Sequence, residues 1–234
     1  RNSISRKLRY FSQVFTGFLL LILCDSSIIK LFSFNASNIF VYFFIIIFSI
    51  FLITAIINFF NFMDGIDGLV ASIFIFYLFY LCLTDSTNKI FLLSSLIAFL
   101  FFNWRPARIF MGDSGSTFIG AVYVGTLLEA NDFHDLFLRI IMLTPLLGDA
   151  IITLIIRILN RQNIFEAHKL HLYQRLNQAG MKHDQITLLY LGASISICLA
   201  GLYSLFISSI FALCVFFLGV YLNNKKAVPF NKYY

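Results

Sequence analysis

Apolar residues form long runs that recur along almost the whole chain, with only short polar segments between them. A helix crosses the apolar part of a bilayer with about 20 such residues and satisfies its own backbone hydrogen bonds there. The pattern therefore predicts an all-α, polytopic integral membrane protein with eight transmembrane helices in this chain. The predicted spans are residues 10–29, 39–60, 69–83, 90–103, 117–128, 136–158, 186–204 and 205–222.

The polar segments between these runs alternate in character. One set is short and acidic or neutral, and comprises residues 30–38, 84–89 and 129–135. The other set is basic and carries motifs, and comprises residues 1–9, 61–68, 103–116, 160–185 and the tail from 223. Of the 17 basic residues, only Lys30, Lys89 and Arg139 belong to the first side. Because basic residues are enriched in cytoplasmic segments, we expect the second side to face the cytoplasm.

Composition supports the membrane interpretation. The chain is 60% hydrophobic and 12% charged, whereas a soluble domain carries about 25% charged residues. The net charge of +6 reflects the cytoplasmic segments, and no basic stripe stands apart from them, so the lipid bilayer rather than nucleic acid is the expected partner. The four cysteines lie inside apolar runs, without disulfide or zinc spacing.

The acidic residues are the sharper clue to function. Six of the eleven lie at or near the predicted cytoplasmic helix ends: Asp64, Asp67, Asp113, Asp149, Glu166 and Asp184. Carboxylates at membrane depth are costly and are functional candidates by default. The exception is Asp184, which we predict to be the N-cap of the next helix. Asp149 lies inside a span that Pro145 should kink, and it is expected to orient a loop group indirectly.

The first motif, Asn61 to Gly68, places Asp64 and Asp67 three residues apart with a glycine after each. A helix predicted from Leu69 would offer free N–H groups suited to phosphate. The two carboxylates are therefore candidates to hold Mg²⁺ or the polar groups of a nucleotide. A tight turn without a ligand is an alternative, and a calcium loop is disfavoured because its further acids and closing Glu are missing.

The second motif runs from Asn103 to Ser116 and places Asp113 between two glycines at the start of a predicted helix. This arrangement fits Mg²⁺, which takes one or two carboxylates together with substrate phosphates. Arg105 and Arg108 are candidates for bidentate phosphate contacts, with simple membrane anchoring as the alternative. The glycine spacing and lysine of a Walker loop are absent.

The third motif, residues 165–175, carries His168 and His171 together with Lys169, Tyr173 and Arg175. Cationic and imidazole groups on one loop suit a diphosphate and its departing charge. A zinc pair is the alternative, but a third soft ligand is missing nearby. We therefore expect this loop to contribute a cationic face to the site.

Together the three motifs resemble the polyprenyl-phosphate N-acetylhexosamine-1-phosphate transferases, glycosyltransferase family 4. The segment EAHKLHLYQRL, with residues 145–157, is most similar to the branch that initiates O-antigen synthesis. The resemblance implies transfer of an N-acetylaminosugar-1-phosphate from a UDP-sugar to undecaprenyl phosphate, with release of UMP. It also implies Mg²⁺, or alternatively Mn²⁺, and an active site on the cytoplasmic face of the bacterial inner membrane, serving lipopolysaccharide and cell wall biogenesis.

The resemblance assigns roles to matching positions. Asp113 and Asp67 would hold the metal and act in catalysis with His171, the residue expected to contact the diphosphate. The expected nucleotide and cofactor contacts are Asn61, Asp64, Asn103, Arg105 and His168. The sequence departs from the family pattern in this loop: His168 stands where some members have Asp, and Tyr173 and Gln174 where others have histidines.

The family's paired-aspartate loop is missing; in relatives it precedes a basic stretch like Ser5 to Arg9. The chain begins with Arg1, followed by polar and basic residues without a signal-peptide pattern. We therefore expect a single transferase domain, residues 1–234, truncated at its N-terminus and inactive alone. The full-length protein would have about ten spans, and a homodimer is compatible with this arrangement. The main alternative is a membrane transporter, which would place its acids near span midpoints.

Overall fold

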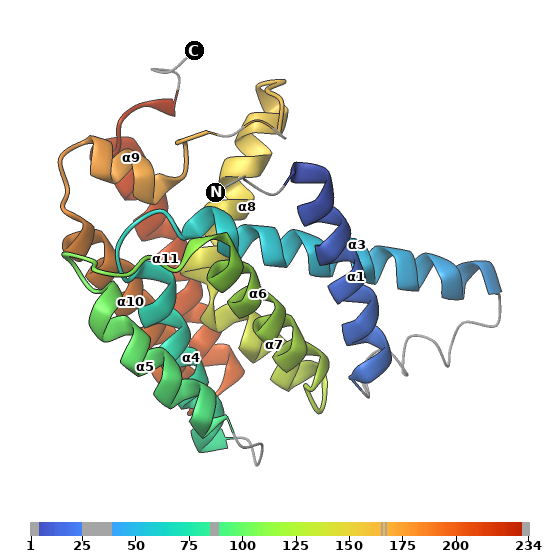
Figure 1. Cartoon of the computed structure of the whole chain (residues 1–234). Coiled ribbons are helices and arrows are strands. Elements are labelled where there is room, and N and C mark those ends of the chain that lie inside the picture. Colours follow the sequence, from blue (N-terminus) through green and yellow to red (C-terminus); the bar gives the residue numbers. More distant parts are fainter. Residues whose placement is uncertain (1–4, 25–38, 85–88, 165, 167, 231–234) are drawn as a thin grey trace. The chain divides into compact units, whose positions relative to one another are not determined.

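The computed structural model describes residues 5–24, 39–84, 89–164, 166 and 168–230. These residues form helices and connecting loops, and no strand occurs among them. The helices are α1 (Arg6–Leu23), α3 (Ile39–Met63), α4 (Leu69–Thr84), α5 (Ile90–Asn103), α6 (Gly112–Leu128), α7 (Phe133–Met142), α8 (Thr144–Leu159), α9 (Leu172–Gln178), α10 (His183–Gly201) and α11 (Leu205–Lys225) (Figure 1).

Each of the eight predicted apolar runs overlaps a helix or, for residues 136–158, the pair α7 and α8; the run 10–29 overlaps α1 as far as Leu23, and its residues 25–29 lie outside the described residues. By length and composition, α3, α10 and α11 can cross a bilayer, and the bent pair makes a fourth span if it is taken as one. Helices α4 and α5 are shorter and apolar. The all-helical, polytopic fold is therefore confirmed for the described residues, while the count of eight spans stays a prediction. The predicted segment 30–38 and residues 85–88 of the predicted segment 84–89 lie outside the described residues.

The sixth run is broken where its proline predicts a kink. Helix α7 ends at Met142, and α8 begins at Thr144 with Pro145 in its first turn. Proline has no backbone N–H and clashes with the preceding turn, so it is tolerated only where a helix begins. The break therefore divides the run just before the proline.

Two details of the predicted cytoplasmic segment 160–185 are corrected. It contains the short helix α9, which the hydrophobic pattern does not reveal because the helix has only seven residues. Asp184 is not the N-cap of α10: the helix starts at His183 with Lys182 as its N-cap, and Asp184 lies in the first turn. Gln185 supplies the capping contact instead, since its Oε1 accepts from the Lys182 N–H at 3.0 Å.

The chain divides into two compact units. The first unit comprises residues 1–61 and 113–139, and the second comprises residues 62–112 and 140–234. In the first unit, α3 and α6 approach closely, because a Cβ on Gly120 would lie 2.9 Å from the Ile57 Cα. Gln13 of α1 and Asn58 of α3 exchange two side-chain hydrogen bonds of 3.3 and 2.8 Å, so these amides satisfy each other in an apolar setting.

A buried arginine also stabilises the first unit. The Arg139 guanidinium donates to both carboxylate oxygens of Asp135 at 2.7 Å and to the Thr126 carbonyl at 2.5 Å. A charge with so little exposure is tolerated because its donors are paired. The hydroxyl of Tyr123 donates to the Arg139 carbonyl at 3.2 Å, which ties α6 to α7.

In the second unit, α4 packs against α5 and α10, and α10 packs against α11, as Figure 1 shows. Helix α4 is the most buried of these, whereas α11 exposes most of its large apolar side chains. Exposed phenylalanines such as Phe206 and Phe217 suit a surface in contact with lipid. The second unit thus holds a packed bundle whose loops at one end carry most of the predicted motifs.

Candidate active site

In the first unit, Asp113 lies in the first turn of α6 and pairs with Arg9 of α1. The Asp113 side chain is 62% exposed. Gly112 precedes it with φ +65°, a backbone conformation that favours glycine. Nearby, the Ser116 hydroxyl donates to the Asn61 Oδ1 at 2.8 Å. An accessible carboxylate at a helix N-terminus beside a guanidinium can serve both a cation and a phosphate.

In the second unit, Asp67 is held by two segments that the sequence keeps apart. Its Oδ2 accepts from the Ala107 N–H at 3.3 Å, and its backbone carbonyl accepts from the Thr187 hydroxyl at 3.0 Å. The Nδ1 of His183 lies 3.5 Å from the Asp67 Oδ1. The first motif, the second motif and the start of α10 therefore meet at this carboxylate.

Asn103 joins the first two motifs from the end of α5. Its Oδ1 accepts from the Gly68 N–H at 3.1 Å, and its Nδ2 donates to the Ile109 carbonyl at 2.9 Å. The side chain is buried, so its immediate role is to hold two loops together, and a direct ligand contact stays a prediction. Arg105 remains partly exposed, with Nη1 3.6 Å from the Asp184 Oδ1.

Tyr173 of α9 joins the first motif to the third. Its hydroxyl donates to the Phe62 carbonyl at 2.9 Å and accepts from the Gln174 Nε2 at 3.0 Å. Burial, reinforced by the nearby Asp149 charge, raises the pKa of Tyr173 above its usual range, so the hydroxyl keeps its proton. A Cβ on Gly65 would lie 2.1 Å from this hydroxyl oxygen. The glycine after Asp64 is thus required by the approach of Tyr173.

The two histidines of the third motif lie together, with ring centroids 4.9 Å apart. His171 is 3% exposed and its ring also stacks near Phe62 at 6.2 Å. Burial lowers the pKa of His168 to about 4, and the neighbouring His171 and Arg157 act in the same direction. His168 is therefore neutral near pH 7, and its Nδ1 accepts from the Leu170 N–H at 3.3 Å.

Arg175 does not belong to the cationic face that the sequence predicts. It is 3% exposed, and its guanidinium donates to the Leu170 and Val228 carbonyls at 3.0 Å each, and to the Asn223 side chain. The Phe230 ring lies 5.4 Å from its central carbon. Every one of these contacts is internal, so Arg175 ties α9 to the tail after α11 rather than presenting a charge to a ligand.

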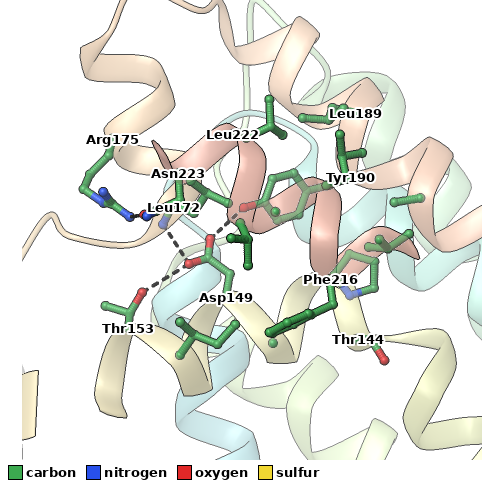
Figure 2. A pocket seen from close by; sticks show the side chains of 18 of the residues that line it. Thr144, Asp149, Thr153, Leu172, Arg175, Leu189, Tyr190, Phe216, Leu222 and Asn223 are labelled. Carbon is green, nitrogen blue, oxygen red and sulfur yellow. Dashed lines mark hydrogen bonds between the residues drawn. The ribbon is translucent and has the colours of Figure 1, made fainter. Parts of the chain in front are cut away.

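Helices α8 to α11 line a partly open, mostly apolar cavity of about 270 Å³ beside the third motif, the histidine loop (Figure 2). Its polar wall is formed by Asp149, Tyr190, Arg175 and Asn223. Figure 2 shows the Asp149 carboxylate directed at the start of α9 and at the Tyr190 hydroxyl. These polar groups are engaged with one another, so the space that remains in the cavity is apolar.

The zinc alternative receives no support: among the described residues, no three His, Cys, Asp or Glu side chains gather in a metal-binding arrangement. Mg²⁺ needs only one or two carboxylates beside phosphate oxygens, so Asp67 and Asp113 fit it by chemistry. Because the two belong to different units, their joint action stays a prediction.

Several residues that contact the predicted site were not singled out from the sequence. They are Arg9 beside Asp113, His183 and Thr187 beside Asp67, and Tyr190 beside Asp149. The spacing of His183 and Thr187 places them on one face of α10, but only packing reveals that this face meets Asp67.

The resemblance of the three motifs implies glycosyltransferase family 4, and comparison with known proteins confirms this family. Residues 1–131 match the model of glycosyl transferase family 4. This is more than half of the chain, and the chain belongs to that family.

The most informative relative is a probable undecaprenyl-phosphate N-acetylglucosaminyl 1-phosphate transferase of Bacillus subtilis, 36% identical over 159 residues. That match covers 61% of this chain and 44% of the relative. A decaprenyl-phosphate N-acetylglucosaminephosphotransferase of Mycobacterium leprae is 31% identical over 43% of this chain and 29% of its own. A phospho-N-acetylmuramoyl-pentapeptide-transferase of Thermotoga neapolitana is 38% identical over 37% of this chain and 29% of its own. The chain thus spans less than half the length of these relatives.

Proposed function

We propose that the complete protein transfers an N-acetylhexosamine-1-phosphate from a nucleotide sugar to a polyprenyl phosphate in the membrane. Family membership and the relatives' activities support this function over the transporter alternative. The observation that carries it is the convergence within the second unit. Three side chains tie the Asp64–Asp67 turn to its neighbours. Asn103 ties it to the loop that carries Arg105, Tyr173 ties it to the histidine loop, and Thr187 ties it to α10.

The finer proposal is that the donor is a UDP-N-acetylaminosugar and the acceptor undecaprenyl phosphate. An oxygen of the lipid phosphate would attack the β-phosphorus of the donor. The bond between that phosphorus and the bridging oxygen would break, and UMP would leave with the electron pair. Phosphoryl transfer depends mainly on positioning and charge neutralisation.

Asp113 and Asp67 would hold Mg²⁺, or alternatively Mn²⁺, since carboxylate oxygens are the ligands these ions prefer. The ion would neutralise the diphosphate charge. Arg105, which is exposed at the loop, would bind phosphate oxygens, while Asp64 and Asn61 would meet the nucleotide. His171 would contact the diphosphate from the histidine loop. The site would lie at the cytoplasmic face of the inner membrane; the basic residues of the motif-bearing segments support this orientation. The sequence of the histidine loop supports a role in O-antigen initiation.

A transfer assay tests this function. Membranes containing the complete gene product are incubated with radiolabelled UDP-N-acetylglucosamine, undecaprenyl phosphate and Mg²⁺, and the lipid extract is counted; a panel of UDP-N-acetylaminosugars follows. We expect labelled lipid and UMP, and a loss of about 100-fold or more in Asp113→Asn. The matched control is Asp132→Asn, which changes an exposed acid in the segment predicted to face the other side.

Two results would count against the proposal. If no donor in the panel gives labelled lipid, the proposed transferase activity is wrong. Transfer by Asp113→Asn at the unmutated rate would remove Asp113 from the metal site while leaving the family assignment intact.

A further inference from the structure

Outside the three motifs, Asp149 is a buried carboxylate among mostly apolar helices. It lies in α8 and is 7% exposed. A carboxylate with so little contact with water is costly unless donors satisfy it. Asp149 accepts four hydrogen bonds from the protein, and their origin indicates what the residue does.

Two of the donors belong to the start of α9. The Leu172 N–H donates to the Asp149 Oδ1 at 2.7 Å, and the Tyr173 N–H donates to Oδ2 at 3.1 Å. These are the first two residues after His171, and such N–H groups have no partner within their own helix. The backbone that follows His171 is therefore held to α8 by one carboxylate.

The other two donors brace the carboxylate. The Tyr190 hydroxyl of α10 donates to Oδ2 at 2.7 Å, and the Thr153 hydroxyl, one turn along α8, donates to Oδ1 at 3.2 Å (Figure 2). Since Asp149 and Tyr190 lie on different helices, their bond sets where the carboxylate points. Tyr190 thus acts on the histidine loop through Asp149.

The imidazole of His171 is directed at the same carboxylate. Its Nδ1 lies 3.8 Å from the Asp149 Oδ1, is buried and has no hydrogen-bond partner. An N–H at this position would be attracted by the carboxylate, whereas a lone pair would be repelled by it. The charge of Asp149 therefore favours the tautomer with the proton on Nδ1.

We propose that Asp149 and Tyr190 form a positioning pair that sets the orientation and tautomer of His171, with Nδ1 protonated and Nε2 left to meet the ligand. The start of α9 has the arrangement of a capping box, in which the Gln174 N–H faces the His171 side chain and the Gln174 Oε1 accepts from the His171 N–H at 3.2 Å. The competing tautomer would make Nδ1 the acceptor for the Gln174 N–H and put the proton on Nε2. The effect of this pair on catalysis rests on the proposed function, whereas its effect on the orientation and tautomer of His171 does not.

The same pair acts on the first motif through Tyr173. Asp149 holds the Tyr173 N–H, and the Tyr173 hydroxyl is bound to the Phe62 carbonyl and lies against Gly65. A change at Asp149 or Tyr190 therefore shifts both His171 and the residue next to Asp64. The buried carboxylate of α8 therefore connects the first and third motifs.

The test uses the complete gene product labelled with ¹⁵N-histidine in lipid nanodiscs, where the nitrogen shifts distinguish the two tautomers. His171→Gln assigns the His171 signals. We expect Nδ1–H in the unmutated protein and a change toward Nε2–H in Asp149→Asn. In Tyr190→Phe, which keeps the ring packing, we expect shifted His171 signals and a kcat about tenfold lower, with KM for the donor nearly unchanged. Tyr123→Phe is the matched control, because it removes another buried hydroxyl, the one bound to the Arg139 carbonyl.

An Nε2–H tautomer in the unmutated protein would overturn the proposal. Unchanged His171 signals in Tyr190→Phe would also overturn it. The same holds if Tyr123→Phe changes the His171 signals and kcat as much as Tyr190→Phe does. Should Asp149→Asn fail to fold, Tyr190→Phe decides alone. If no transfer is found with any donor, the proposed function fails, while the nitrogen shifts still decide whether Asp149 and Tyr190 position His171.

Discussion

At the scale of single residues, close approaches decide which side chains the site tolerates. Gly65 is the clearest case, because the Tyr173 hydroxyl occupies the position of its missing Cβ. The glycines therefore differ in purpose: Gly112 permits a positive φ, whereas Gly65 makes room. The basic residues of the third motif also differ from one another: His168 is neutral near pH 7, whereas the Arg175 guanidinium is bound to groups inside the protein.

Gly65→Ala should destabilise the protein by about 2 kcal/mol through overpacking and abolish transfer, because Tyr173 must move and take α9 with it. Thermal unfolding in detergent and the transfer assay measure the two effects. Gly125→Ala is the control, since its added Cβ meets nothing within 4 Å; it should change stability by less than about 1 kcal/mol. Equal behaviour of the two variants would show that the contact between Tyr173 and Gly65 does not constrain the loop.

The lowered pKa of His168 makes stability depend on pH in a defined direction. Between about pH 4 and the ordinary value of 6.5, the unfolded chain binds more protons than the folded one. The stability is therefore complete above pH 6.5 and is lost as the pH falls toward 4. The melting temperature of His168→Gln should fall less between pH 7 and pH 5 than that of the unmutated protein. The melting temperature of His134→Gln, changed at an exposed position, should fall as much as that of the unmutated protein. An identical loss in His168→Gln would contradict the assignment.

At the scale of elements, short segments hold the long helices in a functional arrangement. The seven-residue α9 is bound at its start, where Leu172 donates to Asp149 and Tyr173 donates to Phe62. It is also bound at its middle, where Arg175 donates to the tail. The start of α10 holds the Asp67 turn through Thr187. Such contacts place loop groups on rigid supports, which is what positioning in group transfer requires.

The tail after α11 should depend on Arg175. Arg175→Met keeps an apolar stem but removes the side-chain bonds to Val228 and Asn223, while the Val228 N–H can still donate to the Arg175 carbonyl at 3.3 Å. The tail should therefore loosen, and trypsin should cut at Lys225 and Lys226 several-fold faster. Arg108→Gln removes an exposed cation and serves as the control. Unchanged cleavage in Arg175→Met would mean that other contacts are sufficient to hold the tail.

At the scale of the whole molecule, the exposed apolar surface indicates the environment, and the charge pattern predicts the orientation. The exposed apolar side chains of α3 and α11 suit lipid, and the basic segments of the sequence are predicted to face the cytoplasm. The two units each contribute candidate residues, with Asp113 in the first and Asp67 and His171 in the second.

The orientation can be tested by labelling with a membrane-impermeant maleimide after the four native cysteines are replaced by alanine. Lys169→Cys should react only in permeabilised cells, and Asp132→Cys should react in intact cells, because basic segments stay in the cytoplasm. Both positions are exposed. The reverse labelling pattern would mean that the histidine loop faces the outside of the cell, where it could not meet a nucleotide sugar from the cytoplasm.

The sequence alone determined the helical membrane fold, the approximate positions of the long helices and the break before Pro145. These follow from local properties: apolar run length, proline geometry and charge. It also located Asp64, Asp67, Asp113 and His171 beside helix ends, in three motifs that resemble glycosyltransferase family 4, and the match to the family model covers the first two of these motifs.

Tertiary structure alone decided which of these groups meet. The bond from Tyr173 to Phe62 joins residues 111 apart, and that from Tyr190 to Asp149 joins residues 41 apart. It also showed that Arg175 points inward and that Asp184 is not the cap of α10. The physical reason is that a hydrogen bond depends on the packing of whole helices, and local patterns of hydrophobicity carry no information on which distant donor will arrive beside a buried acceptor.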